Sequence, residues 1–182
     1  MPTPDRGLGR ALPETCRRLI PPDAPGPAQA DLRRAISTAY YAAFHALAET
    51  CADRLVGAEQ STRPNRAWVE VYRGLEHGTC LTACEGARNT AFPEGIKDFA
   101  SGFVRLHRAR ESCDYDPMVR PTRALAMMFI ESAENAVTAL QASPEGDQVA
   151  FVSWVLITGK GAQRARTLVR TGQEGQLATP AG

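Results

Sequence analysis

Apolar side chains recur at intervals of three and four residues along almost all of this 182-residue chain. That spacing places them on one face of an α-helix, which turns once every 3.6 residues or so. Alternating runs of apolar and polar residues, the pattern of a half-buried strand, are missing. With 43% hydrophobic and 23% charged residues, the chain is sized for one domain with its own core. The sequence therefore predicts an all-α protein.

Six segments show this periodicity, and stretches rich in proline or glycine separate them. They cover residues 8–19, 28–53, 64–82, 94–112, 122–141 and 147–157. We expect the second segment to be the central helix, because it is rich in alanine and carries Ile36, Tyr40 and Leu47 on one stripe. The chain is then divided into a short helix with a stiff proline-rich linker (1–27), a helical bundle (28–159) and a basic, mostly disordered tail (160–182).

The charges of the chain are almost balanced, with 21 basic and 20 acidic residues and a net charge of +1. No uniform field therefore attracts it to nucleic acid or to an anionic membrane. Its uncharged runs are too short to span a bilayer, and its first residues form no apolar signal segment. We expect a cytoplasmic protein whose five cysteines are free thiols.

Arg110 is the first candidate for chemistry, because a helical wheel places it within the apolar stripe of residues 94–112. A buried charge without a partner costs several kcal/mol. Asp114 lies one helical turn further on, where a carboxylate can meet an arginine, and Tyr115 adds a hydroxyl. Two interpretations remain open: a structural network that fixes the helix end, or a cradle for an anion or phosphate, whose oxygens match the guanidinium fork.

The central helix offers a surface for Arg110 to contact. Tyr40 lies in its apolar stripe, and Tyr41 and His45 lie beside it, one turn apart. A buried tyrosine usually finds a hydrogen-bond partner, so we expect Tyr40 or Tyr41 to reach Arg110 or Asp114. His45 by itself is expected to be an ordinary core or boundary histidine. The predicted ligand-binding residues are Tyr40, Tyr41, Arg110, Asp114 and Tyr115.

Two stretches of sequence carry a resemblance to a known family. Residues 33–47, RRAISTAYYAAFHAL, resemble the helix with a tyrosine pair in bacterial HEPN domain proteins. Residues 99–117, FASGFVRLHRARESCDYDP, resemble the later helix in which these proteins carry an arginine followed by an Ala-Asp-Tyr-like turn. The resemblance implies an antiparallel bundle of five or six helices over residues 28–159, and a homodimer.

Many HEPN proteins are endoribonucleases that need no metal and use an arginine followed, after four to six residues, by a histidine. No histidine follows Arg110 before Pro117, so this chain lacks the usual general acid and base there. Arg73 and His77 come one residue short of the motif. At that spacing we expect both side chains on one exposed helix face, either as half of a composite site across a dimer or as an ordinary solvated surface.

The sequence indicates neither a metal site nor another cofactor. His77, Cys80 and Cys84 have ligand-like spacing, but a structural zinc site needs a fourth ligand. We therefore predict a HEPN-like module that binds RNA, a nucleotide or a cognate protein partner in a stress or defence context. We do not expect it to bind a membrane. The alternatives are a metal-independent endoribonuclease toxin that uses Arg73 and His77, and a structural accessory protein without a ligand.

Overall fold

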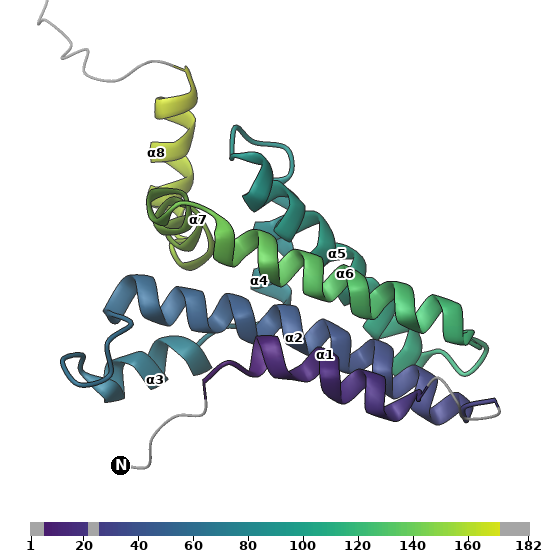
Figure 1. Cartoon of the computed structure of the whole chain (residues 1–182). Coiled ribbons are helices and arrows are strands. Elements are labelled where there is room, and N and C mark those ends of the chain that lie inside the picture. The colour runs from purple at the N-terminus through teal and green to yellow at the C-terminus, as the bar shows by residue number, and fades with distance from the viewer. Residues whose placement is uncertain (1–5, 22–25, 172–182) are drawn as a thin grey trace, which may run out of the picture.

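The computed structural model of the chain describes residues 6–21 and 26–171. These residues form eight α-helices and no strand, which confirms the all-α class (Figure 1). The helices are α1 (Leu8–Leu19), α2 (Gln29–Val56), α3 (Asn65–Arg73), α4 (His77–Ala87), α5 (Glu94–Tyr115), α6 (Arg123–Ala142), α7 (Glu145–Leu156) and α8 (Lys160–Thr171). This part of the chain thus contains eight helices where six segments were predicted, because residues 64–82 hold two helices and residues 160–171 form a further one.

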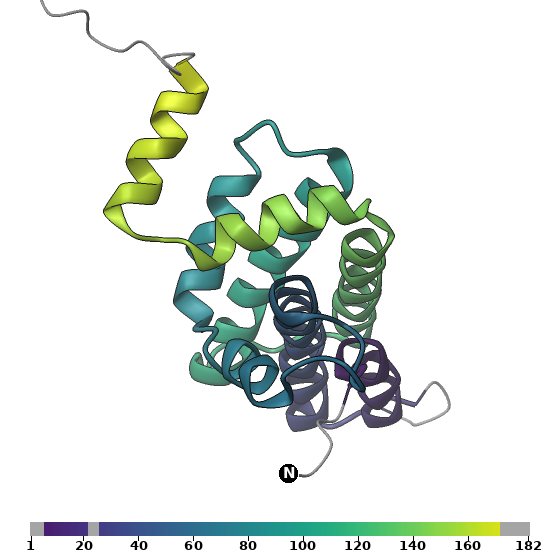
Figure 2. The ribbon, with the colours of Figure 1, turned by 90° about the vertical axis from the view of Figure 1, so that its left-hand side faces the viewer.

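Helix α2 lies at the centre of the molecule, and α1, α5 and α6 all pack against it (Figure 2). All of its alanines except Ala30 are buried, and their small side chains let the neighbouring helices come close. Helix α1 comes so close that a Cβ atom added to Gly9 would lie 2.8 Å from the Cβ of Ala46. The alanine-rich composition that marked α2 as central is what allows this packing.

Helix α1 belongs to the bundle. It packs against both α2 and α6, and Arg17 donates two hydrogen bonds to the carboxylate of Glu134 on α6. Cys16 and Ile20 are buried in the common core. The short first helix predicted for residues 8–19 is therefore present, with the same bounds, and contributes to the same core as the later helices.

The single helix predicted for residues 64–82 is two helices. Helix α3 ends at Arg73, and Glu76 has extended backbone angles before α4 begins at His77. Gly74 stands at the break, and glycine is a weak helix former. The two helices bury different neighbours, because α3 packs on α2 whereas α4 packs on α5 and α7. The break therefore lets each short helix turn its own apolar face inward.

The predicted disordered tail is wrong for residues 160–171, which form α8. Arg166, in the middle of this helix, connects it to the end of α7, because its guanidinium donates hydrogen bonds to the carbonyl oxygens of Trp154 and Ile157. The guanidinium carbon also lies 4.2 Å from the centre of the Trp154 ring, within the range of a cation–π contact. Figure 2 shows α8 standing away from the rest of the bundle. Residues 172–182 lie outside the described residues.

None of the helices in the described part of the chain combines the length and the hydropathy needed to cross a membrane.

The contact between Gly9 and α2 gives a first testable prediction. An exposed helical glycine gains about 0.4–1 kcal/mol of stability on replacement by alanine, because the unfolded chain loses freedom. At Gly9 the new methyl group would meet Ala46 and the carbonyl oxygen of Ala42, so Gly9→Ala is expected to lower the free energy of unfolding by about 1–3 kcal/mol. Denaturant unfolding of the purified protein measures the change.

Gly78 supplies the matched control, because no atom lies within 4 Å of the position a Cβ would take there. Gly78→Ala should leave the protein as stable or make it slightly more stable. Equal effects of the two substitutions would contradict the close packing of α1 on α2.

Candidate functional site

Tyr40 on α2 is fully buried at the centre of an aromatic cluster. Its hydroxyl lies 2.7 Å from Nδ1 of His77, which α4 supplies. Its ring makes edge-to-face contacts with Phe103 and His107 on α5, at centroid distances of 5.5 and 5.3 Å. Burial raises the pKa of Tyr40 well above its usual value, so the phenol stays protonated at neutral pH. Tyr40 is thus the point at which α2, α4 and α5 meet.

Arg110 on α5 lies among three tyrosine rings, and its side chain is only 14% exposed. Its guanidinium carbon lies 5.7 Å from the ring centre of Tyr40, 6.0 Å from that of Tyr41 and 5.6 Å from that of Tyr115. These distances fall within the range of cation–π attraction. Burial lowers the pKa of Arg110, but the hydrogen bond with Tyr41 and the electrostatic effects of Tyr41, Tyr115 and Asp114 together outweigh it, so the pKa is raised and the charge is kept.

The expected ion pair between Arg110 and Asp114 is present, with Nε 3.0 Å from Oδ2. The Nε atom is nevertheless buried without a hydrogen bond, so its N–H does not point at the carboxylate. Asp114 is held instead from α2, where the hydroxyl of Ser37 donates to the same Oδ2 over 3.2 Å. The Nε–H group of Arg110 is therefore a buried donor without a hydrogen-bond acceptor.

A second arginine fixes the end of α5. The guanidinium of Arg33 on α2 donates to the carbonyl oxygens of Cys113, Asp116 and Val119 at 2.6, 2.9 and 3.2 Å. These bonds satisfy carbonyl groups that a helix end leaves without partners. They also explain why α5 runs on to Tyr115, beyond the end predicted at residue 112. Tyr115 is left 73% exposed beside Arg110.

We call the five predicted residues the Arg110 cluster: Tyr40, Tyr41, Arg110, Asp114 and Tyr115. The structure brings all five together between α2 and the end of α5. Tyr40 forms the buried floor, whereas Tyr41 is half-buried and Tyr115 is exposed. The expected hydrogen bond of Tyr40 goes to His77, which lies closer than Arg110 or Asp114.

All three histidines of the chain adjoin this cluster. Nδ1 of His45 lies 2.7 Å from the hydroxyl of Tyr72, so His45 is a boundary histidine with a partner, as expected. His107 is 4% exposed, and its Nδ1 has no hydrogen bond, the carboxylate of Glu111 being 3.6 Å away. Sequence reasoning missed His107, although it lies four residues after Phe103 and three before Arg110, on the same helix face.

Burial lowers the pKa of each of the three histidines. The positive charge of Arg110 lowers that of His77 further, whereas Glu111 partly opposes the change at His107. Because of this burial, each histidine is less easily protonated in the folded chain than in the unfolded chain. The surroundings of the Arg110 cluster therefore favour the neutral form of these imidazoles.

This difference predicts that the protein loses stability as the pH falls. Below the unfolded histidine pKa of about 6.5, the unfolded chain binds more protons than the folded chain, so acid favours unfolding. The free energy of unfolding should fall between pH 7.5 and 5.5, with a slope of up to about 1.4 kcal/mol per pH unit for each histidine. Urea unfolding across this range measures it, and His107→Phe should flatten the slope. An unchanged slope in that variant would contradict the burial of His107.

The predicted pairing of Arg73 with His77 on one exposed helix face is wrong. Arg73 is the exposed last residue of α3, whereas His77 is the half-buried first residue of α4. The break at Gly74 separates them and turns His77 toward Tyr40. His77 therefore belongs beside the Arg110 cluster, and Arg110 is the arginine that influences its pKa.

The cysteines take no part in this site. All five are buried free thiols. Burial raises the pKa of Cys80 to about 12, so its metal-binding thiolate form is negligible at neutral pH. Among the residues that the structure describes, no group of three or more His, Cys, Asp and Glu side chains is placed to hold a metal ion.

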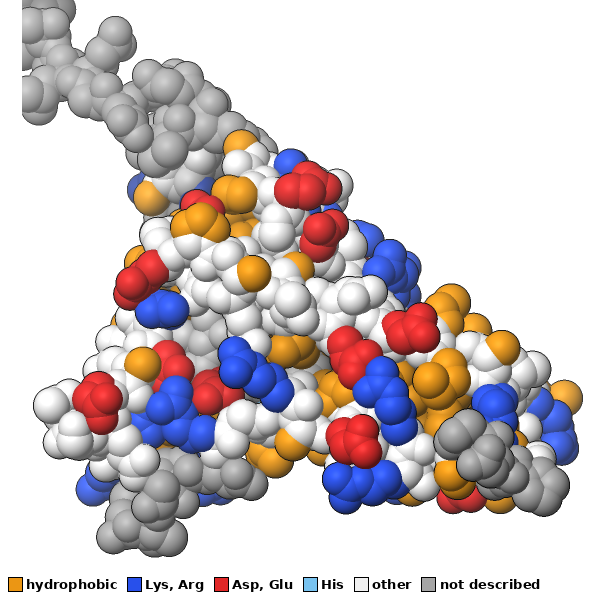
Figure 3. Space-filling model, in the orientation of Figure 1, with side chains coloured by type: hydrophobic (Ala, Val, Ile, Leu, Met, Phe, Trp, Pro, Cys, Tyr) orange, Lys and Arg blue, Asp and Glu red, His pale blue; other side chains and the backbone are white. Residues whose placement is uncertain are grey.

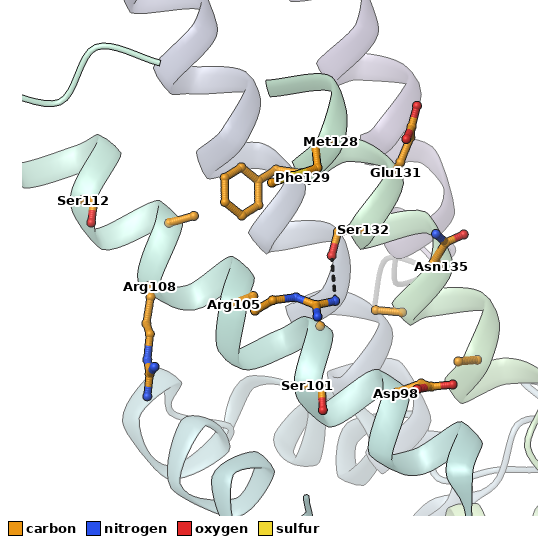
Figure 4. Close-up of a pocket in the computed structure, with 14 residues that line it drawn as sticks. Asp98, Ser101, Arg105, Arg108, Ser112, Met128, Phe129, Glu131, Ser132 and Asn135 are labelled. Carbon is orange, nitrogen blue, oxygen red and sulfur yellow. Dashed lines mark hydrogen bonds between the residues drawn. The ribbon is translucent and has the colours of Figure 1, made fainter. Parts of the chain in front are cut away.

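A separate hollow lies between α5 and α6 (Figure 4). It encloses about 800 Å³, and none of its lining residues belongs to the Arg110 cluster. Small side chains form its floor, among them Gly102, Ala109 and Ala136. No buried titratable side chain lines it, in contrast to the Arg110 cluster on another face of α5.

Comparisons with protein-family models, curated proteins and solved structures found no match to this chain. Its function must therefore be argued from the site itself.

Proposed function

We propose that this chain is a HEPN-like module that binds a ribonucleotide, free or as part of single-stranded RNA, at the Arg110 cluster. The observation that supports this function best is the position of the Arg110 guanidinium. It is a fixed positive charge among tyrosine rings, one of them 73% exposed, and it lies beside the carboxylate of Asp114. A positive charge and an exposed aromatic face are what a nucleotide requires of a binding site.

Each part of a nucleotide has a matching group in the cluster. The exposed ring of Tyr115 offers a face on which a base can stack. The guanidinium of Arg110 can donate to phosphate oxygens. Asp114 would repel a phosphate placed directly against it, but its carboxylate can accept hydrogen bonds from ribose hydroxyl groups. This combination favours RNA over DNA, because only RNA supplies the 2′-hydroxyl.

Tyr115 provides the direct test of stacking. Tyr115→Ala is expected to weaken binding of a fluorescently labelled single-stranded RNA by about 1–3 kcal/mol, or roughly 5- to 150-fold in Kd. Stability should change by less than about 0.5 kcal/mol, because the ring is exposed. Met118→Ala is the matched control, since Met118 lies three residues after Tyr115 and is 83% exposed. Fluorescence anisotropy with the RNA and its DNA equivalent gives both affinities.

Arg110→Lys separates binding from a purely structural role. Lysine keeps the charge but loses the planar fork, so RNA binding should weaken about tenfold at a nearly unchanged melting temperature. A large fall in melting temperature with RNA affinity retained would favour the structural accessory protein instead. Absence of RNA binding by the folded wild-type chain would also exclude the proposed function.

A specific observation favours one second candidate, a metal-independent endoribonuclease that uses His77 with Arg110. The bond between His77 Nδ1 and the Tyr40 hydroxyl fixes the imidazole ring, and burial keeps it neutral. The tautomer that donates from Nδ1 to Tyr40 leaves Nε2 free to take a proton from a ribose 2′-hydroxyl. Arg110 would then stabilise the charge that develops on the attacked phosphate.

This candidate predicts that the purified protein cleaves single-stranded RNA in the presence of EDTA. His77→Ala should reduce the rate by at least about 100-fold, the usual contribution of a general base. Arg73→Ala should leave the rate unchanged, because Arg73 is exposed on another helix. Denaturing gel electrophoresis of the RNA measures cleavage, and intact RNA after incubation with the wild-type protein would exclude the enzyme.

A further inference from the structure

The last helix, α8, carries a charge opposite in sign to that of the rest of the chain. Residues 160–171 contain no acidic residue and four basic ones, Lys160, Arg164, Arg166 and Arg170. Because the whole chain has 21 basic and 20 acidic residues, the residues outside α8 have a net charge of −3. On the face shown in Figure 3, acidic and basic side chains lie interspersed over the bundle. The positive charge of α8 is therefore local, within about three helical turns.

Two cations of α8 have no partner in the part of the chain that the structure describes. Lys160 and Arg164 are exposed, and neither side chain takes part in an ion pair or a hydrogen bond there. They lie four residues apart, so they share one face of the helix. Like charges at this spacing repel each other and destabilise a helix. An anionic partner bound along this face would remove the repulsion.

A third cation, Arg166, holds α8 in a position that leaves this face open. It lies against Trp154, and its guanidinium donates to carbonyl oxygens at the end of α7. Carbonyl groups carry no net charge, so these bonds anchor the helix without neutralising it. A helical wheel places Lys160 and Arg164 away from the side of Arg166. Since α8 extends away from the bundle (Figure 2), a long partner can reach this face without meeting the other helices.

The composition of α8 favours a phosphate backbone over other anionic partners. A helix that lies on a membrane surface buries large apolar and aromatic side chains opposite its charges. An acidic protein would also need an aromatic or apolar anchor at the centre of its interface. Residues 160–171 contain no aromatic residue, and Leu168 and Val169 are their only apolar residues larger than alanine. Three of the four cations are arginines, whose forked N–H groups match phosphate oxygens.

We propose that α8 is a second binding site, which takes the phosphodiester backbone of a nucleic acid through Lys160 and Arg164. RNA and DNA share this backbone chemistry, so the site should bind both without reading the base sequence. Its binding free energy comes largely from released counterions, and the affinity therefore falls as the salt concentration rises. The inference goes beyond the proposed function and does not depend on it, because α8 and the Arg110 cluster lie at opposite ends of the molecule (Figure 1).

Removal of the two exposed charges tests this site. The double variant Lys160→Gln and Arg164→Gln is expected to weaken binding of a labelled single-stranded DNA by at least about tenfold at about 50 mM salt. The plot of log Kd against log salt concentration should become less steep by about 1.4, or about 0.7 for each lost phosphate contact. Fluorescence anisotropy of the full chain from about 50 to 200 mM salt measures both. DNA is the probe because the Arg110 cluster is expected to favour RNA.

The matched control removes two positive charges elsewhere. Arg18→Gln with Arg66→Gln changes the net charge by the same amount, and these side chains are 73% and 86% exposed on α1 and α3. This control should bind DNA with the wild-type affinity and salt dependence, and an equal loss in both double variants would overturn the proposal. Circular dichroism should show one melting temperature for all three proteins, because the altered side chains are exposed.

Two further results would overturn the proposal: a wild-type chain that does not bind DNA at about 50 mM salt, or an α8 double variant with the wild-type slope. Binding to vesicles of phosphatidylserine and phosphatidylcholine that is lost in the α8 variant, without a change in DNA binding, would assign the helix to a membrane surface instead. Failure of the Arg110 cluster gives a different result. Tyr115→Ala would then leave RNA affinity unchanged, while the α8 variant would still lose affinity for DNA.

Discussion

A positive charge enclosed between two long helices is the interaction on which the rest of the site depends. Arg110 enters the layer between α2 and α5, where water cannot solvate it fully. The protein compensates with three aromatic rings and a carboxylate, and α2 supplies Tyr40, Tyr41 and the Ser37 hydroxyl that holds this carboxylate. An uncompensated charge here would cost several kcal/mol, so the two helices can pack in only a narrow range of registers. Arg33 fixes the same register at the end of α5.

The helical class, the central place of α2 and the grouping of Arg110 with the tyrosines could all be predicted from local spacing. Each depends on which face of a helix a side chain occupies, and the 3.6-residue period sets that face. The break between α3 and α4 could not be predicted in this way. It depends on which neighbours Trp68 and Cys80 bury, and these are distant in sequence. Because a single helix was predicted for residues 64–82, His77 was expected to pair with Arg73 rather than with Tyr40.

Helix α8 and His107 illustrate two other limits. The composition of residues 160–171 is typical of a solvated tail. The helix is held by Arg166, which donates a hydrogen bond to the carbonyl oxygen of Trp154 and lies over the Trp154 ring. No local pattern indicates that contact. The burial of His107 could have been predicted from the helical wheel that places Arg110 in the apolar stripe. The two residues lie three positions apart, on the face of α5 toward Tyr40.

The five cysteines have a practical consequence for anyone who handles this protein. Each thiol is buried, and burial raises the pKa of each, so the folded chain exposes almost no thiolate to alkylating or oxidising reagents. Modification can then proceed only through transient opening of the core. The rate at which a maleimide labels each cysteine of the native chain therefore reports how often the structure around that cysteine opens. The cysteines extend from Cys16 on α1 to Cys113 on α5, so labelling compares local opening in different helices.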